Sequence, residues 1–322
     1  QSLIRTTLEP VIKEKIAKLG NMDGADKAKE LLKMKVCDAA SGSGHIALAM
    51  ARTLAWYVCT LRTGEDNPAS LDYREALREV IQKCIYAVDY NPDAVELCKV
   101  VLWIEGYCAG KPLSFLDHHI RCGNSVVGVT DLDMLLKGVP KEAFYSESKE
   151  TLKRIKEKNK EALDEIASVK KSKKEGFSWT FFSDDHVITN IDEEQVGLAN
   201  KVREINALPE ETLLEQLTKQ KRWEDLMVSP RVECLRRACD IYTYSFYKRF
   251  THAELETVLS EDGTHFISRT YPYTRTIYQA LGEIKNIDEP SDYFKPLSDG
   301  FKEEVCLVAK SNRYFHWCVE FP

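Results

Sequence analysis

The chain has 322 residues, of which 43% are hydrophobic and 30% are charged, and its formal net charge at pH 7 is −6. This composition is typical of a soluble globular protein, with enough apolar residues for the cores of one or two domains. The acidic balance excludes a protein coated in positive charge, although a local basic cleft could still bind nucleic acid. No run of about 18 apolar residues and no signal-peptide pattern occurs, so we expect a cytoplasmic protein without a membrane span.

The first 130 residues alternate between helical and strand patterns. In the helical stretches apolar residues recur at helical spacing, whereas the strands are short apolar runs followed by an acid or a glycine turn. The expected helices are 2–19, 45–62, 71–83 and 92–108, and the expected strands are 33–38, 84–89 and 119–124. Strands that alternate with helices predict a parallel, doubly wound sheet.

After about residue 130 the pattern becomes mainly helical. Residues 148–175 are dense in Lys and Glu, which favours a solvated helix with paired charges over an arm that faces DNA. Residues 193–250 give further helical patterns, one of which begins at Ser229-Pro230. Residues 251–310 are rich in Tyr, Pro and Asp, and we expect them to be irregular. The coarse expectation is an α/β core that carries a largely helical appendage.

Ten cysteines are scattered along the chain without a CxxC pair, which favours small buried side chains in a reducing compartment. The neighbours His118 and His119 could suggest a metal site. Adjacent residues on a strand point to opposite faces, however, so we expect no metal there.

The segment Asp38–His45 is a glycine loop between the first expected strand and the next helix. Gly42 and Gly44 remove the Cβ atoms that would block a ligand, and the helix beginning at His45 presents its free N–H groups to that ligand. The alternative is a tight turn that has no part in ligand binding. The loop is compatible with S-adenosylmethionine, and Gly42-x-Gly44-x-x-Ala47 also satisfies a loose dinucleotide fingerprint.

Three polar residues at the strand ends favour S-adenosylmethionine. Asp38 could complement a cationic methionine end and would repel a pyrophosphate. Asp89 could accept hydrogen bonds from both ribose hydroxyls, and Asn124 could bond the adenine. Asp89 lies 45 positions after Gly44, whereas a dinucleotide unit expects about 20. The alternatives are that Asp89 caps a helix and that Asn124 caps a turn.

These segments resemble DNA adenine-N6 methyltransferases. Asp38–His45 is similar to their D-P-A-C-G-S-G-H motif, and Ile85–Val95 is similar to their second motif. The stretches Glu96–Trp103, Pro112–Ser125 and Phe315–Pro322 resemble a narrower group, the methylases of type IIG restriction-modification systems and PglX-type phage-defence systems. The resemblance is strong over residues 30–130, weak over 131–310, and returns in the last dozen residues.

The resemblance implies a Rossmann-like class I methyltransferase core with an incomplete parallel sheet and a mainly α-helical appendage. The implied domains are a core at 1–130, the appendage at 131–310 and a return to the core at 311–322. The implied cofactor is S-adenosylmethionine. The matching positions imply cofactor-binding residues Asp38, Ala40, Ser41, Gly42, Ser43, Gly44, His45, Asp89, Tyr90, Asn91, Asn124 and Ser125.

The sequence departs from the family in ways that limit the expected activity. Ala39 and Ser41 replace the family's Pro and Cys. No Asn-Pro-Pro-aromatic catalytic motif occurs in the sequence. Asn91-Pro92-Asp93 matches only its first two residues and belongs to the second motif. We therefore expect an inactive piece of a site-specific enzyme that flips and methylates adenine in double-stranded DNA, with weakened cofactor affinity. The alternatives are a nicotinamide-dependent oxidoreductase and a non-catalytic DNA-docking or assembly module with a vestigial cofactor site.

A last expectation concerns basic residues after position 230, which could contact DNA phosphates or simply be solvated. They are Arg231, Arg236, Arg237, Lys248 and Arg249.

Overall fold

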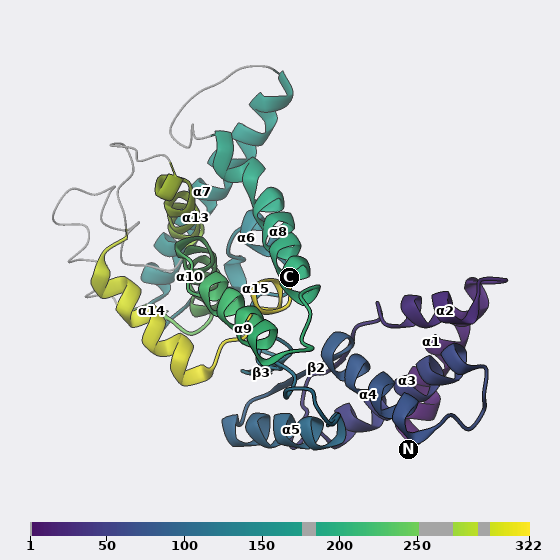
Figure 1. Cartoon of the computed structure of the whole chain (residues 1–322). Coiled ribbons are helices and arrows are strands. Elements are labelled where there is room, and N and C mark those ends of the chain that lie inside the picture. Colours follow the sequence, from purple (N-terminus) through teal and green to yellow (C-terminus); the bar gives the residue numbers. More distant parts are fainter. Residues whose placement is uncertain (1, 176–184, 251–272, 289–296) are drawn as a thin grey trace. The chain divides into compact units, whose positions relative to one another are not determined.

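The computed structural model describes residues 2–175, 185–250, 273–288 and 297–322 (Figure 1). The chain divides into two compact units. Unit 1 consists of Gln1–Ser125 and Val202–Glu224, and unit 2 consists of Val126–Lys201 and Asp225–Pro322. The closing segment 311–322 therefore lies in unit 2, and residues 202–224 lie in unit 1. The boundaries expected at residues 130 and 310 stay predictions.

Unit 1 is a mixed α/β structure around a small parallel sheet. The strands are β1 (Val36–Asp38), β2 (Ile85–Asp89) and β3 (Ile120–Cys122), in the order β1-β2-β3. In register, Asp38 lies opposite Ala87 and Asp89 lies opposite Cys122. The helices are α1 (Ser2–Lys18), α2 (Gly24–Leu31), α3 (His45–Thr63), α4 (Ser70–Lys83), α5 (Pro92–Glu105) and α9 (Leu213–Met227). The parallel strands joined by helices confirm the α/β prediction for this part of the chain.

The core of unit 1 lies between the sheet and helices α3, α4 and α5, which are neighbours in Figure 1. Along α3 the side chains of Ala47, Ala51, Leu54 and Val58 are fully buried, at the helical spacing that the sequence indicated. Burial of each leucine-sized side chain stabilises the fold by about 2 kcal/mol. This packing fixes the start of α3 against the sheet.

Residues 202–224 complete unit 1 through a buried polar network. The Glu210 carboxylate accepts hydrogen bonds from Lys219 Nζ at 2.6 Å and from the Phe115 backbone N–H at 2.9 Å. Trp223 is buried, and the Arg121 guanidinium lies 5.8 Å from the centre of its ring. No sequence pattern predicted this return, because Glu210 lies 95 positions after Phe115 and Trp223 lies a similar distance after Arg121.

Unit 2 is mainly helical. Its helices are α6 (Asp133–Lys137), the short 3-10 helix η1 (Lys141–Ala143), α7 (Lys149–Glu175), α8 (Asp185–Asn206), α10 (Pro230–Tyr244), α13 (Thr274–Asp288), α14 (Asp299–Asn312) and α15 (Trp317–Glu320). Strands β4 (Tyr145–Ser146) and β5 (Arg249–Phe250) pair in parallel. Helix α10 packs against α13 and α14 (Figure 1).

Two helical predictions are confirmed and one irregular region is corrected. Helix α7 carries exposed pairs such as Arg154–Glu150 at 2.7 Å, and α10 begins at Pro230 with Ser229 as its N-cap. The expectation of irregular structure over 251–310 is wrong for α13 and α14, where apolar residues such as Ile277 and Leu281 are buried at helical spacing. Residues 251–272 and 289–296 lie outside the described residues.

The expectation that the cysteines are buried is wrong for Cys37 and Cys122, which are exposed, and none of the ten cysteines forms a disulfide. Both lie on three-residue strands, which are too short to bury every side chain. The argument about His118 and His119 also needs correction. Both precede β3 in a turn, and their buried rings stack with centroids 3.9 Å apart.

Over the ranges that the structure describes, no helix has the length and apolar character needed to cross a bilayer. No group of three or more His, Cys, Asp or Glu side chains suited to a metal ion occurs in those ranges.

Candidate functional site

The carboxyl ends of the three parallel strands of unit 1 lie side by side. Asp38 ends β1, Asp89 ends β2, and Gly123 follows β3 directly. The Asp89 carbonyl accepts a hydrogen bond from the Gly123 N–H at 2.9 Å, which brings Asn124 next to the end of β2. Ligands of open α/β sheets bind outside the carboxyl ends of the strands, so this edge is the candidate site.

The glycine loop after β1 is attached to the end of β2. The Ser41 N–H donates to the Val88 carbonyl at 3.0 Å, and the Gly42 N–H donates to Asp89 Oδ2 at 2.7 Å. Gly42 has a φ of 52°, and a Cβ built there would meet no atom within 4 Å. A side chain at Gly42 would be strained and would fill open space, which agrees with a backbone that a ligand can approach.

Gly44 is required for a different reason from the one expected. It is the left-handed N-cap of α3, with a φ of 87°, and a Cβ there would lie 2.6 Å from Cys98 Sγ on α5. Gly44 therefore permits close packing of α5 against the loop and does not clear space for a ligand. Burial raises the pKa of the Cys98 thiol to about 11, so Cys98 serves as a packing residue.

Asp89 joins the loop to the turn after β2. Its Oδ2 atom accepts from Gly42, and its Oδ1 atom accepts from the Asn91 N–H at 2.8 Å. The N-cap of α5 is Asn91, whose side-chain oxygen accepts from the Asp93 N–H at 3.0 Å. Asn91, and not Asp89, is therefore the helix cap, which excludes the alternative that Asp89 caps α5.

Asp38 retains unused hydrogen-bonding capacity. Its Oδ1 atom accepts from the Ala40 N–H at 3.2 Å, whereas its Oδ2 atom is buried and has no hydrogen-bond partner. A buried carboxylate oxygen without a partner is costly, and most buried polar atoms in proteins are satisfied. Asp38 therefore offers a place for a ligand that carries a positive charge or a hydrogen-bond donor.

The remaining predicted residues surround the same loop or the same strand ends. Ser41 is buried, and His45 is exposed at the start of α3, with its Nδ1 atom 2.9 Å from Ser43 Oγ. Tyr90 lies beside Asp89 and is 51% exposed. Asn124 and Ser125 are partly buried directly after Gly123, and Ala40 is exposed in the loop. Unit 1 thus gathers the whole predicted set at one edge of the sheet.

Helix α3 adds an electrostatic component. Its N-cap is Gly44, which has no side chain that could accept a hydrogen bond from the first turn. The N-terminus of a helix of this length carries a partial positive charge. The edge therefore combines backbone donors with two carboxylates, and can hold a ligand that has both cationic and hydrogen-bonding groups.

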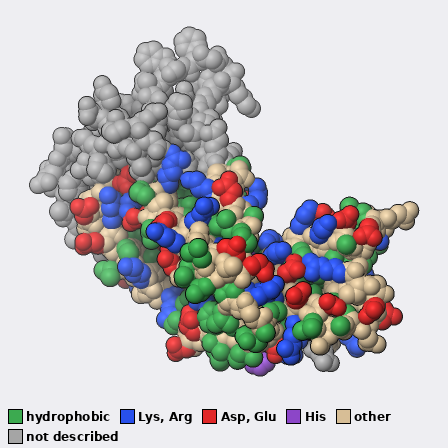
Figure 2. Space-filling model, in the orientation of Figure 1, with side chains coloured by type: hydrophobic (Ala, Val, Ile, Leu, Met, Phe, Trp, Pro, Cys, Tyr) green, Lys and Arg blue, Asp and Glu red, His purple; other side chains and the backbone are tan. Residues whose placement is uncertain are grey.

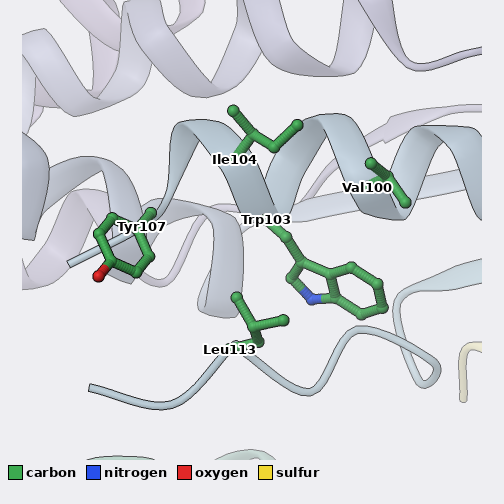
Figure 3. Close-up of a pocket in the computed structure, with 5 residues that line it drawn as sticks. All are labelled: Val100, Trp103, Ile104, Tyr107 and Leu113. Carbon is green, nitrogen blue, oxygen red and sulfur yellow. The ribbon is translucent and has the colours of Figure 1, made fainter. Parts of the chain in front are cut away.

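An apolar pocket on α5 was not predicted. It has a volume of about 400 Å³ and is lined by Val100, Trp103, Ile104, Tyr107 and Leu113 (Figure 3). The Trp103 indole N–H donates to the Ser114 carbonyl at 2.7 Å, which fixes the ring. Hydrophobic side chains gather over this part of the surface in Figure 2. The exposed apolar positions of α5 were a signal in the sequence, but the pocket shares no residue with the loop.

Three of the five basic residues that were considered as possible DNA contacts form ion pairs within unit 2. Arg236 pairs with Glu320 at 3.3 Å. Arg237 pairs with Glu283 at 2.7 Å, and Lys248 pairs with Glu304 at 2.9 Å. These partners favour a structural role for the three cations.

The fold and the site together define a mixed α/β protein with a candidate ligand site at the carboxyl ends of its strands. The chain is similar to a protein of Methanocaldococcus jannaschii named "putative type II restriction enzyme and methyltransferase", with 29% identity over 159 residues. The match covers 40% of this chain and 13% of that relative, so the chain spans a small part of its length. No family model and no solved structure matches. The comparison supports a relationship to restriction-modification methyltransferases.

Proposed function

We propose that the strand-end site of unit 1 binds S-adenosylmethionine on a Rossmann-like class I core. We further propose that the chain is part of a cytoplasmic enzyme that methylates adenine N6 in double-stranded DNA, in a restriction-modification or phage-defence system. The buried Oδ2 atom of Asp38 carries the proposal, because an acceptor without a partner beside an open glycine backbone suits a cationic ligand.

Each strand end has a part in the proposed binding. Asp38 accepts from the ammonium group of the methionine end. Asp89 has both oxygens engaged by backbone N–H groups, but each carboxylate oxygen can accept two hydrogen bonds, so two positions remain for the ribose hydroxyls. Asn124 bonds the adenine, and Tyr90, which is half exposed, packs beside it.

When bound, S-adenosylmethionine supplies an electrophilic methyl group on its sulfonium. The residues of this chain orient the donor and hold its polar groups. The chain contains no Asn-Pro-Pro-aromatic motif, so we assign it donor binding and not the binding of the flipped adenine.

A nicotinamide-dependent oxidoreductase fits the site less well. A dinucleotide places its pyrophosphate against the glycine loop, and the buried Asp38 oxygen would repel that negative charge. The spacing between Gly44 and Asp89 is also longer than a dinucleotide unit expects.

The test is calorimetric titration of the protein with S-adenosylmethionine and, separately, with NAD. We expect binding of S-adenosylmethionine and a loss of roughly 10- to 100-fold in affinity for Asp38→Asn, the cost of a charged hydrogen bond. Asp23→Asn is the matched control, because Asp23 accepts from the Ala25 N–H in the same i to i+2 geometry at the start of α2. Binding of NAD without binding of S-adenosylmethionine would refute the proposal.

A further inference from the structure

The two aspartates at the strand ends differ in what they already bind in the ligand-free molecule. Asp89 uses both carboxylate oxygens, one for Gly42 and one for Asn91, at 2.7 and 2.8 Å. Asp38 uses one oxygen for Ala40, and its other oxygen is buried without a partner. A single expectation, that both are ligand contacts, does not explain this difference.

We infer that Asp89 is a positioning residue that clamps the glycine loop into its binding shape before any ligand arrives. Backbone N–H groups that donate to a carboxylate form charge-assisted hydrogen bonds, which are about twice as strong as neutral ones. The clamp joins residues 47 positions apart, so it fixes the loop to the end of β2 and not only to its own neighbours.

The clamp matters because the loop would otherwise be costly to order. Gly42 has a φ of 52° and meets no neighbouring atom at its Cβ position, so side-chain packing does not hold it in place. Glycine loses more conformational freedom on ordering than any other residue. A loop ordered during folding spares this cost when the ligand binds, which is the general benefit of preorganisation.

The functional part of this inference rests on the proposed S-adenosylmethionine site, whereas the clamp itself does not. Two of the acceptor positions of Asp89 hold the loop, and the other two remain for a ligand. Asp89→Asn keeps the shape of the side chain, but its NH2 group cannot accept from a backbone N–H. One of the two clamped amides then loses its partner.

The experiment compares Asp89→Asn, Asp38→Asn and the unmodified protein, each without ligand, by amide hydrogen exchange. For Asp89→Asn we expect roughly tenfold faster exchange at Gly42 or Asn91, the effect of losing one charged hydrogen bond, with the buried α3 amides near Leu54 unchanged. For Asp38→Asn we expect exchange like that of the unmodified protein. Titration with S-adenosylmethionine should show a loss of affinity in both variants.

Each outcome has a distinct meaning. If Asp89→Asn loses affinity but leaves exchange at Gly42 and Asn91 unchanged, the clamp is refuted and the proposed function stands. If exchange rises but the unmodified protein does not bind S-adenosylmethionine, the clamp is supported and the proposed function fails.

A second measurement on the unmodified protein covers the case in which Asp89→Asn does not fold. In the ligand-free protein, amide exchange at Gly42 and Asn91 should be slow, because both N–H groups donate to Asp89. Exchange of both amides at the rate of an unstructured peptide would overturn the clamp.

Discussion

The strand-end site of unit 1 and the charged interior of unit 2 use their polar groups in opposite ways. In unit 2, His316 Nδ1 accepts from the Val129 N–H at 3.1 Å, and His316 Nε2 lies 2.9 Å from an oxygen of Asp240. Arg237 and Lys248 are likewise paired with glutamates. At the strand ends of unit 1, the buried Asp38 oxygen has no partner. The paired charges stabilise the fold of unit 2, whereas the Asp38 oxygen lies beside an open glycine backbone at the carboxyl ends of the strands, where ligands of α/β sheets bind.

The largest expected effect concerns the buried ion pair within residues 202–224, whose Glu210 carboxylate also accepts from the Phe115 backbone N–H. The side chains of Glu210 and Lys219 are each 3% exposed, and Glu210→Ala leaves the Lys219 charge buried and unpaired. We expect a loss of about 3–5 kcal/mol in the free energy of unfolding, measured with urea. A loss below about 1 kcal/mol would show that this pair is not structural.

The second largest expected effect is the pH dependence of the free energy of unfolding of unit 1. Burial lowers the pKa of both His118 and His119 well below the ordinary value of 6.5, and the cations Lys219 and Lys35 act on both in the same direction. In the unfolded chain these histidines take up protons near pH 6.5, whereas in the folded chain they stay neutral. The free energy of unfolding therefore keeps its full value above about pH 6.5. It decreases as the pH falls below about 6.5 towards the pKa of the two histidines in the folded chain.

The expected slope below pH 6 is about 1.4 kcal/mol per pH unit for each histidine, measured by urea unfolding between pH 7.5 and 5. His119→Phe should remove about half of it. A stability that stays flat over this range would contradict neutral, buried histidines.

A third prediction separates the two loop glycines. Gly44→Ala places a Cβ against Cys98, whereas Gly42→Ala meets only open space, and both carry the strain of a positive φ. We expect Gly42→Ala to cost about 1–2 kcal/mol and Gly44→Ala about 1–3 kcal/mol more, because it also overpacks the contact with α5. Equal losses in thermal unfolding would refute the different roles assigned to the two residues.

The smallest expected effect is a difference in the reactivity of two cysteine thiols, Cys98 and Cys122. With a pKa of about 11, Cys98 is only about 0.1% thiolate at pH 8 and is buried, whereas Cys122 is exposed. N-ethylmaleimide should therefore modify Cys122 and spare Cys98, as read by mass spectrometry. Modification of both at similar rates would show that α5 does not cover the loop as described.

The sequence predicted the local features of unit 1 well. Apolar periodicity located α3 and α5, and the acids and glycines located the strand ends at Asp38 and Asp89. These features depend on neighbours in the chain. Periodicity did not reveal the contact between Glu210 and Phe115 or the contact between Gly44 and Cys98, because both depend on segments that meet only in the folded structure. Nor did it distinguish Asp38 from Asp89, whose difference lies in hydrogen-bond partners and not in residue type.

The central claim is that the unpartnered Asp38 oxygen marks the binding site of a cationic methyl donor. The most direct measurement is calorimetric titration of the unmodified protein and of Asp38→Asn with S-adenosylmethionine. The account predicts binding to the unmodified protein and a loss of roughly 10- to 100-fold in the variant, with Asp23→Asn unaffected. Equal affinity of Asp38→Asn and the unmodified protein, or no binding to either, would contradict it.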